Sequence, residues 1–431
     1  MRQRGRLIAA GAAALVALLL VGGVWLLIFR PWRQAQRFPD GTVLTLEGST
    51  YQKHWLTVSD GWKWWTPARQ LLLPRDRQHS ANGMALWFTA ADGTGGRGLA
   101  VVPGGFHPWE LGVALTAQAV DEHGDRIGPL HRSWPAAIPG QNRWLTVWLD
   151  AFPRRGRIVR VQYFRPGSSE PAAEFAVDNP TPGPHPVWTA EPYPIRKNAG
   201  DLTCILEKLV TGFGHRQLDA RAAPGESPYT RATFRFEQEG KPTVEWQPVG
   251  ITVSDATGNV LSPWDGFIVR RGKAQELQFA AALSPRESAW KLRVELCRTA
   301  RARFAPQETW TVQGLRVPAR NEVISSTATT RLLGTQIQIQ ELTGPDNAWL
   351  KPRVRVQVRN PRKGYRLTLR ATDEHGRTFA GYGTSSSARQ QLGGMQCDFF
   401  LNLPPDSRTL DLTLALSRSR FLELLARPAE L

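Results

Sequence analysis

Leu115-Thr-Ala-Gln-Ala-Val-Asp-Glu-His-Gly124 and Leu367-Thr-Leu-Arg-Ala-Thr-Asp-Glu-His-Gly376 are two stretches that end in the same tetrapeptide. A third stretch, Val249-Gly-Ile-Thr-Val-Ser-Asp-Ala-Thr-Gly258, keeps the Asp and the Gly. Apolar and polar residues alternate before each turn, which predicts a half-buried β-strand. Asp and Gly supply the side-chain hydrogen bonds and the positive φ of a tight turn. The sequence therefore predicts three related β units in succession.

Each unit also has an opening strand and a closing pair of strands. The opening strands are Thr42–Glu47, Leu202–Glu207 and Thr335–Gln340, and the closing pairs are Trp144–Tyr163, Glu276–Cys297 and Phe399–Leu416. A proline-containing turn interrupts each closing pair, which indicates a hairpin. The repeat period is roughly 115–135 residues. This matches an immunoglobulin domain of about 100 residues together with its loops. We predict an all-β fold of three consecutive immunoglobulin-like β-sandwich domains, at residues 40–180, 201–318 and 323–431.

The junctions between these domains differ in composition. Residues 181–200 are rich in proline, which favours an extended, semi-rigid spacer that lets the first domain swing. The junction at Val317–Arg320 is short, so we expect the second and third domains to move together. The C-terminal stretch Phe421–Arg427 fits either a short helix or a last edge strand.

An uncharged apolar stretch, Leu7–Phe29, precedes the β units. A helix of this length would measure roughly 34 Å, enough to cross the ~30 Å hydrocarbon core of a bilayer. It is longer than the apolar part of a cleavable signal peptide, and bulky residues follow it. We therefore predict a transmembrane helix at residues 7–29, a cytoplasmic tail at residues 1–6, and a single-pass protein whose bulk is extracytoplasmic, in a periplasm or at a cell surface.

The opening strand carries a resemblance. Asp40-Gly-Thr-Val-Leu-Thr-Leu-Glu-Gly-Ser-Thr-Tyr51, together with His54, resembles the start of uncharacterised bacterial proteins that have one amino-terminal membrane span and a β-rich ectodomain. The resemblance implies a bacterial envelope setting. It implies no activity.

The net charge of +17 points to an acidic partner, such as a phosphate-rich polymer, an anionic lipid surface or an acidic glycan. Of the 54 basic residues, 45 are Arg, so a compositional bias is an alternative explanation. The three cysteines do not form a disulfide framework. Cys204 and Cys397 are in phase with apolar neighbours and should be buried, whereas Cys297 is out of phase.

Motifs that carry catalysis or bind metals are missing from the sequence. It contains no closely spaced histidine pair, nucleophile elbow, phosphate-binding loop or Cys-x-x-Cys. The Asp-Glu-His-Gly turns resemble metal ligands, but the middle copy drops both Glu and His, so a turn role is favoured. We predict no catalytic residue, no metal site and no cofactor, and hence not an enzyme.

Two features favour binding. The first is the indole cluster Trp62, Trp64 and Trp65, which could stack on sugar rings or settle among lipid headgroups. Packing against the membrane-proximal linker is the alternative for these three residues. The second is an expected hairpin at Arg353–Arg370, whose outward face would carry five arginines. They are Arg353, Arg355, Arg359, Arg366 and Arg370, and they would face an anionic polymer or simply solvent.

These observations predict a membrane-anchored envelope protein with an interaction or scaffolding role. Its expected partners are the membrane and an anionic envelope polymer, a glycan or another envelope protein. The alternative is a carbohydrate- or cell-wall-acting enzyme with dispersed catalytic residues, which a concave pocket with paired carboxylates would favour. Nucleic acid becomes a candidate partner only if the topology is inverted and the β units face the cytoplasm.

Overall fold

The computed structural model describes residues 34–37, 43–52, 55–58, 69–72, 83–91, 116–128, 131–135, 144–164, 170–214, 227–261, 267–271, 274–279, 282–345, 351–386 and 394–430. The predicted helix at residues 7–29 and the indoles of Trp62, Trp64 and Trp65 lie outside this set. Among these described residues, no helix is long and apolar enough to cross a membrane.

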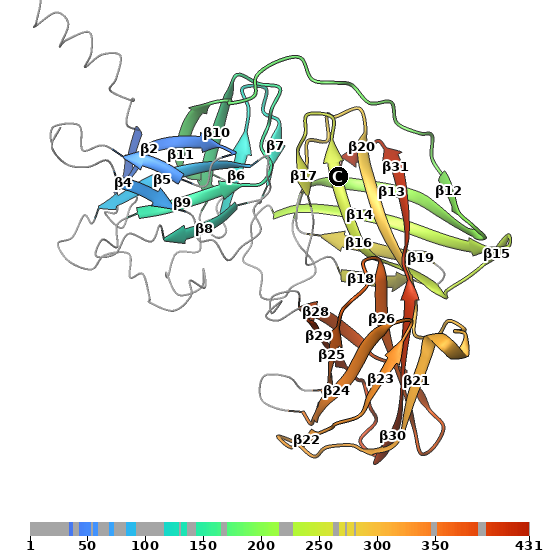
Figure 1. The fold of residues 1–431 in the computed structure, drawn as a ribbon. Helices are drawn as coiled ribbons and strands as arrows, with labels where there is room; N and C mark the ends of the chain where they lie inside the picture. The colour runs from blue at the N-terminus through green and yellow to red at the C-terminus, as the bar shows by residue number, and fades with distance from the viewer. Residues whose placement is uncertain are drawn as a thin grey trace, which may run out of the picture.

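The described part of the chain is all-β, and antiparallel sheets pack in three sandwich-like pairs (Figure 1). The first sandwich has one sheet of β1 (Gln34–Arg37), β2 (Val43–Tyr51), β5 (Met84–Ala91), β9 (Trp144–Leu149) and β8 (His131–Pro135), in that order. Its second sheet is β11 (Pro171–Asp178), β10 (Ile158–Phe164), β6 (Thr116–Val120) and β7 (Arg126–Ile127). A separate two-stranded sheet pairs β3 (Trp55–Val58) with β4 (Arg69–Leu72).

The second sandwich repeats this order. One sheet is β12 (Ile195–Ala199), β13 (Leu202–Gly214), β14 (Ser227–Gln238), β19 (Ala274–Phe279) and β18 (Phe267–Arg271), with β15 (Lys241–Pro242) and β32 (Ala429–Glu430) added beside it. The facing sheet is β17 (Val260–Leu261), β16 (Trp246–Asp255), β20 (Trp290–Arg298) and β31 (Arg420–Ala426).

The third sandwich repeats it again. One sheet is β22 (Val323–Ser325), β24 (Thr335–Thr343), β25 (Arg353–Arg359), β29 (Gly394–Phe400) and β28 (Tyr382–Ser386), with β23 (Thr329–Leu332) beside β24. The facing sheet is β21 (Thr309–Arg316), β30 (Thr409–Arg418), β26 (Tyr365–Asp373) and β27 (Thr378–Ala380). A short 3₁₀ turn at Pro306–Glu308 precedes β21.

Each sandwich encloses one apolar core between its two sheets. The alternation of β25 shows how the sequence builds it, because Val354, Val356 and Val358 are buried and the arginines between them face outward. Burying a side chain of this size stabilises the fold by about 1.5–3 kcal/mol. Cys204 and Cys397 are buried free thiols, as predicted. Cys297 is also free and buried, although its side chain is out of phase with its apolar neighbours.

The three acidic turns form as predicted. In each turn, one carboxylate oxygen of the Asp accepts hydrogen bonds from the backbone N–H groups two and four residues later. The Gly that follows has positive φ in each copy. These residues are Asp121 with Gly124, Asp255 with Gly258, and Asp373 with Gly376.

The Glu of the tetrapeptide has a role of its own. Glu122 accepts the backbone N–H groups of Arg157 and Ile158, where β10 begins. Glu374 likewise accepts those of Arg408 and Thr409, where β30 begins. The carboxylate therefore ties the turn to the start of the next strand of the same sheet, which accounts for the residue without a metal.

The predicted closing hairpins are wrong in all three units. In each one, the two strands belong to opposite sheets: β9 and β10, β19 and β20, and β29 and β30. The segment around the proline crosses the roughly 10 Å between packed sheets instead of turning back on one of them. Because the same crossing recurs three times, it is a property of the repeated unit.

The last edge strands of the second and third sandwiches are exchanged. In the first sandwich, β10 pairs with β11, the next strand along the chain. In the second, β20 pairs with β31 from the C-terminus, while β21 leaves to pair with β30 of the third sandwich. Figure 1 shows β31 beside β20 and β21 beside β30. The strand β21 lies before the predicted boundary at residues 318–323, and β31 lies after it, so each pairs with a strand on the other side of that boundary. The C-terminal stretch Phe421–Arg427 contributes to β31, which is an edge strand and not a short helix.

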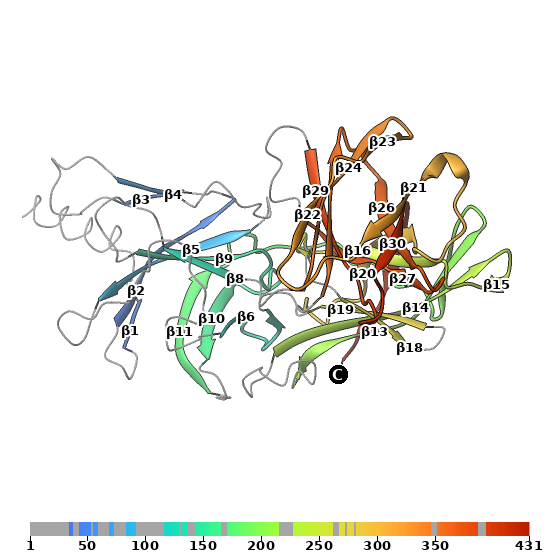
Figure 2. The ribbon, with the colours of Figure 1, turned by 90° about the horizontal axis from the view of Figure 1, so that it is seen from below.

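The proline-rich segment between the first two sandwiches is held along its length. Trp188 O accepts a hydrogen bond from Ser288 Oγ, and Glu191 exchanges hydrogen bonds with Leu425 of β31. Tyr193 Oη donates to Arg427 O at 2.8 Å. In both views the segment follows the second sandwich (Figure 2). These contacts hold the predicted semi-rigid spacer against the second sandwich.

Candidate functional site

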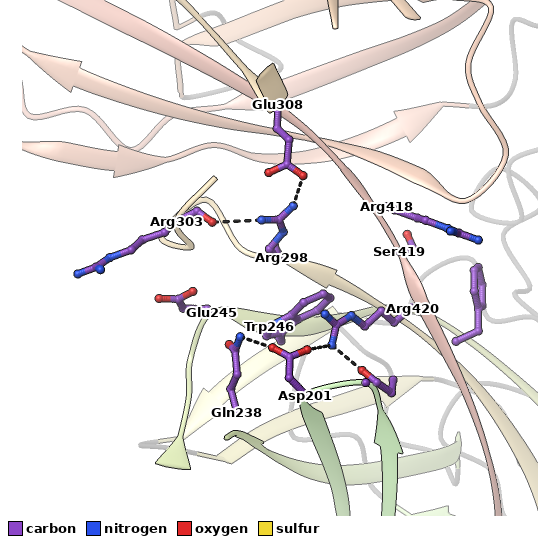
Figure 3. Close-up of a pocket in the computed structure, with 13 residues that line it drawn as sticks. Asp201, Gln238, Glu245, Trp246, Arg298, Arg303, Glu308, Arg418, Ser419 and Arg420 are labelled. Atoms are coloured by element: carbon purple, nitrogen blue, oxygen red, sulfur yellow. Dashed lines mark hydrogen bonds and ion pairs between the residues drawn. The ribbon is translucent and has the colours of Figure 1, made fainter. Parts of the chain in front are cut away.

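A pocket lies where the exchanged strands cross between the second and third sandwiches, and we call it the crossover pocket (Figure 3). Its volume is about 780 Å³. It is lined by the turn before β13, the end of β14, the start of β16, the connection from β20 to β21, and the connection from β30 to β31. The lining residues are Ala199, Gly200, Asp201, Gln238, Glu245, Trp246, Arg298, Arg303, Glu308, Arg418, Ser419, Arg420 and Phe421.

One wall is organised by Arg420. Its guanidinium lies over the Trp246 ring, 4.4 Å from the centroid, and Nη1 is 2.7 Å from Asp201 Oδ1. Gln238 Nε2 donates to the other oxygen of Asp201 at 2.7 Å. The hydrogen bond from Arg420, followed by that from Gln238, lowers the pKa of Asp201 below its ordinary value. Asp201 therefore stays ionised and neutralises Arg420.

The opposite wall is organised by Arg298. Its guanidinium forms an ion pair with Glu308 and donates to Arg303 O at 3.1 Å. The same guanidinium lies 4.6 Å from the centroid of the Phe304 ring. Glu308 also accepts the backbone N–H of Ala305. This wall is thus a second neutralised pair, carried by the connection from β20 to β21.

Two further guanidiniums remain free within the described part of the chain. Arg303 and Arg418 are exposed, and neither side chain makes a hydrogen bond or an ion pair with another described residue. They lie on opposite sides of the pocket in Figure 3. The arginines of the two walls are already paired with carboxylates. Arg303 and Arg418 are therefore the cations available to an incoming anion.

The predicted arginine face does not form. β25 pairs with β24 and β29, whereas β26 pairs with β30 and β27. Arg353, Arg355 and Arg359 therefore lie on one sheet, and Arg366 and Arg370 on the facing one. Sequence periodicity could not reveal this, because a strand alternates in the same way whichever neighbour it pairs with.

Most of these arginines are neutralised by the protein itself. Arg355 lies 2.7 Å from Glu341 and 2.9 Å from Asp398, and Arg353 lies 3.4 Å from Glu341. Arg366 bonds to Glu295 of the second sandwich. Arg359 is exposed and Arg370 is half-buried. Arg353 and Arg355 of β25 therefore belong to an ion-paired row rather than to a uniformly cationic surface.

Sequence reasoning missed the crossover pocket because its residues come from five distant segments. One signal was present in the sequence. Arg298-Thr-Ala-Arg-Ala-Arg303 and Arg418-Ser-Arg420 place several arginines at strand ends, where an adjoining loop can carry them to a common edge. Nothing in the sequence shows that the two ends meet, because that follows from the strand exchange.

Neither a metal-binding cluster nor a similar known protein identifies the ligand of this pocket. Across the described ranges, no group of three or more His, Cys, Asp or Glu is arranged to hold a metal ion. Comparison of the chain with protein families and with curated proteins finds no match.

Proposed function

We propose that this chain is a membrane-anchored interaction or scaffolding protein of a bacterial envelope, and that its crossover pocket binds an anionic envelope component. The length and lack of charge of Leu7–Phe29 support the anchor. Three successive sandwich-like pairs of sheets, each with a path of five strands that faces a four-stranded sheet, support immunoglobulin-like modules, an architecture common in cell-surface domains.

We infer an anionic ligand from the two free guanidiniums, Arg303 and Arg418, at a pocket whose other arginines are paired. Bringing an acidic group to a free guanidinium adds a charge-assisted hydrogen bond without breaking an existing ion pair. Arginine also recognises planar carboxylates with two parallel hydrogen bonds. An acidic polysaccharide meets both requirements.

The enzymatic alternative would need a carboxyl group that can donate a proton. The pocket does bring Asp201, Glu245 and Glu308 together. However, the pKa of Asp201 is lowered by Arg420 and Gln238, and Glu308 is engaged by Arg298 and by a backbone N–H. A general acid requires a pKa near the working pH. Asp201 is therefore a poor proton donor, and the two free guanidiniums favour binding of an anion at this pocket.

The test uses the full chain in detergent micelles, with polygalacturonate as the acidic polysaccharide and dextran as the neutral one. The double variant R303Q/R418Q should weaken polygalacturonate binding by about tenfold or more. High salt should weaken binding by the wild type as well. The matched control R359Q/R370Q removes two charges from the predicted arginine face and should bind as the wild type does.

Two results would overturn the pocket assignment. Unchanged binding by R303Q/R418Q would remove it, and an equal loss in R359Q/R370Q would show that only total charge matters. The anchor and orientation are tested separately, by adding protease to intact cells and to spheroplasts that carry a tag after Leu431. A tag that stays protected until lysis would place the sandwiches in the cytoplasm.

A further inference from the structure

The third sandwich carries a group of side-chain amides on the outward face of its five-stranded path. On β24, Ile337 and Ile339 are buried in the core, so the glutamines that alternate with them face outward and are half-buried. Glutamines of β25 and β29 lie on the same face. We call this surface the amide face, and its members are Gln336, Gln338, Gln340, Gln357 and Gln396.

Strand register lines three of these amides up in one row across the sheet. Gln338 of β24 lies opposite Gln357 of β25, and Gln357 lies opposite Gln396 of β29. Thr329 of β23 lies opposite Gln338 and extends the row to a fourth strand. Neighbouring strands are about 4.7–4.9 Å apart. The row therefore repeats polar, uncharged side chains at the spacing of the strands.

A charged row lies next to the amides, and the protein neutralises it. Glu341, Arg355 and Asp398 lie opposite one another on β24, β25 and β29. Arg355 is 2.7 Å from Glu341 and 2.9 Å from Asp398, and Arg353 is 3.4 Å from Glu341. Two guanidiniums thus face two carboxylates. A charged ligand would have to compete with these ion pairs, whereas an uncharged one would leave them in place.

On the other side of the amide row, Arg331 of β23 and Arg359 of β25 flank Gln336. Both arginines are exposed. A strand rises about 3.4 Å per residue, so these cations lie roughly 7 Å from the row. A chain that runs along the row, across the strands, therefore passes between the ion pairs and the two exposed cations.

An aromatic ring borders the same face. Tyr382 of β28 lies opposite Phe400 of β29, and their ring centroids are 6.0 Å apart. Lys351 Nζ lies 5.0 Å from the centroid of the Tyr382 ring, and 46% of Tyr382 is exposed. An exposed aromatic face can stack on the apolar face of a sugar ring. The amide face thus combines hydrogen-bonding groups with a stacking surface.

The repeated fold does not require these amides. In the second sandwich, the corresponding strands β13 and β14 carry charged side chains on their outward face. Arg235 lies 3.3 Å from Glu207, and Arg196 of β12 lies 3.2 Å from Glu237. Since the same strand order forms there with ion pairs, the amide row is a feature of the third sandwich's surface rather than of its architecture.

We propose that the amide face binds an uncharged, extended sugar chain of the β-1,4-linked glucan type, which runs across the strands along the row of glutamines. A glutamine amide both donates and accepts hydrogen bonds, and so does a sugar hydroxyl group. The sugar units of such a chain follow one another at an interval close to the strand spacing. This face lies outside the crossover pocket, so the proposal does not depend on what that pocket binds.

Fluorescence polarisation of labelled cellohexaose with the full chain in detergent micelles tests the proposal. Q338A/Q357A removes two neighbouring amides and should weaken binding by about tenfold or more. Q307A/Q313A removes two exposed glutamines outside the amide face and is the matched control, which should bind as the wild type does. Labelled isomaltohexaose, whose α-1,6 linkages do not hold the chain extended, should bind at least about tenfold more weakly than cellohexaose.

Two further comparisons identify the kind of contact. Y382A should weaken binding, whereas Y382F keeps the ring and should bind as the wild type does. Binding should change less than about twofold between 0.05 and 0.5 M salt, and R331Q/R359Q should change it equally little. A loss of binding in R331Q/R359Q that high salt reproduces would overturn the proposal, because the face would then recognise an anion.

Hydrogen exchange of the β25 amides shows whether Q338A/Q357A keeps the sheet intact. With unchanged protection, unchanged cellohexaose binding by Q338A/Q357A would overturn the proposal. If protection falls in that variant, the tyrosine pair decides, and equal binding by Y382A and Y382F would overturn it. Absence of cellohexaose binding by the wild type would overturn it as well.

Discussion

Arg366 of the third sandwich reaches Glu295 of the second, with Nε 2.7 Å from Oε1. Ser419, in the connection to the exchanged strand β31, donates to the same Glu295 oxygen at 2.7 Å. Burial would raise the pKa of Glu295, but the hydrogen bonds from Arg366 and Ser419 hold it below its ordinary value. This carboxylate therefore ties the two sandwiches together at the point where their strands cross.

Removing Arg366 should leave the Glu295 charge without its main partner. We expect R366M to lower the free energy of unfolding by about 2–4 kcal/mol, and the double variant R366M/E295Q to recover much of that loss. Urea denaturation of the four members of this cycle measures the coupling. R196M, which removes the exposed partner of Glu237, is the control and should cost about 0.5 kcal/mol. Additive effects of R366M and E295Q would contradict the coupling.

The strand exchange predicts that the second and third sandwiches unfold as one unit. Leu424 of β31 is buried in the second core and Leu414 of β30 in the third. Because each sandwich lacks an edge strand without the other, L424A and L414A should each lower protection of the amides of both β20 and β30. The expected loss is about 3 kcal/mol for either change. Hydrogen exchange measures it, and a loss confined to one sandwich would show independent units.

The sequence predicts the repeat well because its signals are local. An Asp followed two and four residues later by backbone donors, with Gly at positive φ, needs no distant partner, and all three turns form. The burial of Cys204 and of the valines of β25 follows from period-two alternation in the same way.

Pairing is where the sequence falls short. Nothing in Thr309–Arg316 or Arg420–Ala426 distinguishes β20 from β30 as a partner, because both are strands with an open edge. A proline-containing turn is likewise compatible with a hairpin and with a crossing between sheets. The crossover pocket and the two-sheet division of the arginines both depend on those choices, and neither could be derived from periodicity.

Asn259 should dominate the docking of the first sandwich, because it satisfies three polar groups of that sandwich in a buried setting. N259A would leave the Phe152 N–H and carbonyl unsatisfied. We expect protection of the Phe152 amide to fall by about 2–3 kcal/mol, while the amides of β26 stay unchanged. N198A removes an exposed asparagine of β12 and is the control. Unchanged protection of Phe152 in N259A would show that apolar contact alone holds the first sandwich against the second.

The third acidic turn should lose its stabilising effect in acid. Burial would raise the pKa of Asp373, but hydrogen bonds from Arg377 and Ser407 lower it to about 2. The backbone N–H of Thr409, first among its partners, also lowers the pKa of Glu374 to about 2. A carboxyl group whose folded pKa lies below its unfolded value stabilises the fold above the unfolded pKa. The third sandwich should therefore lose stability as the pH falls from about 4 to about 2.

The D373N variant isolates this effect. It keeps an oxygen that can accept the turn's N–H groups but loses the charge that faces Arg377. D373N should be less stable than the wild type at pH 6, and the difference should shrink as the pH approaches 2, where the wild-type carboxyl group is itself protonated. Hydrogen exchange of the β26 and β30 amides, measured at several pH values, follows it. E239Q, at an exposed turn of the second sandwich, should leave the acid-dependent loss in place. A constant difference between D373N and the wild type from pH 6 to pH 2 would assign the stabilisation to turn geometry, because only the ionised carboxylate can make it depend on pH.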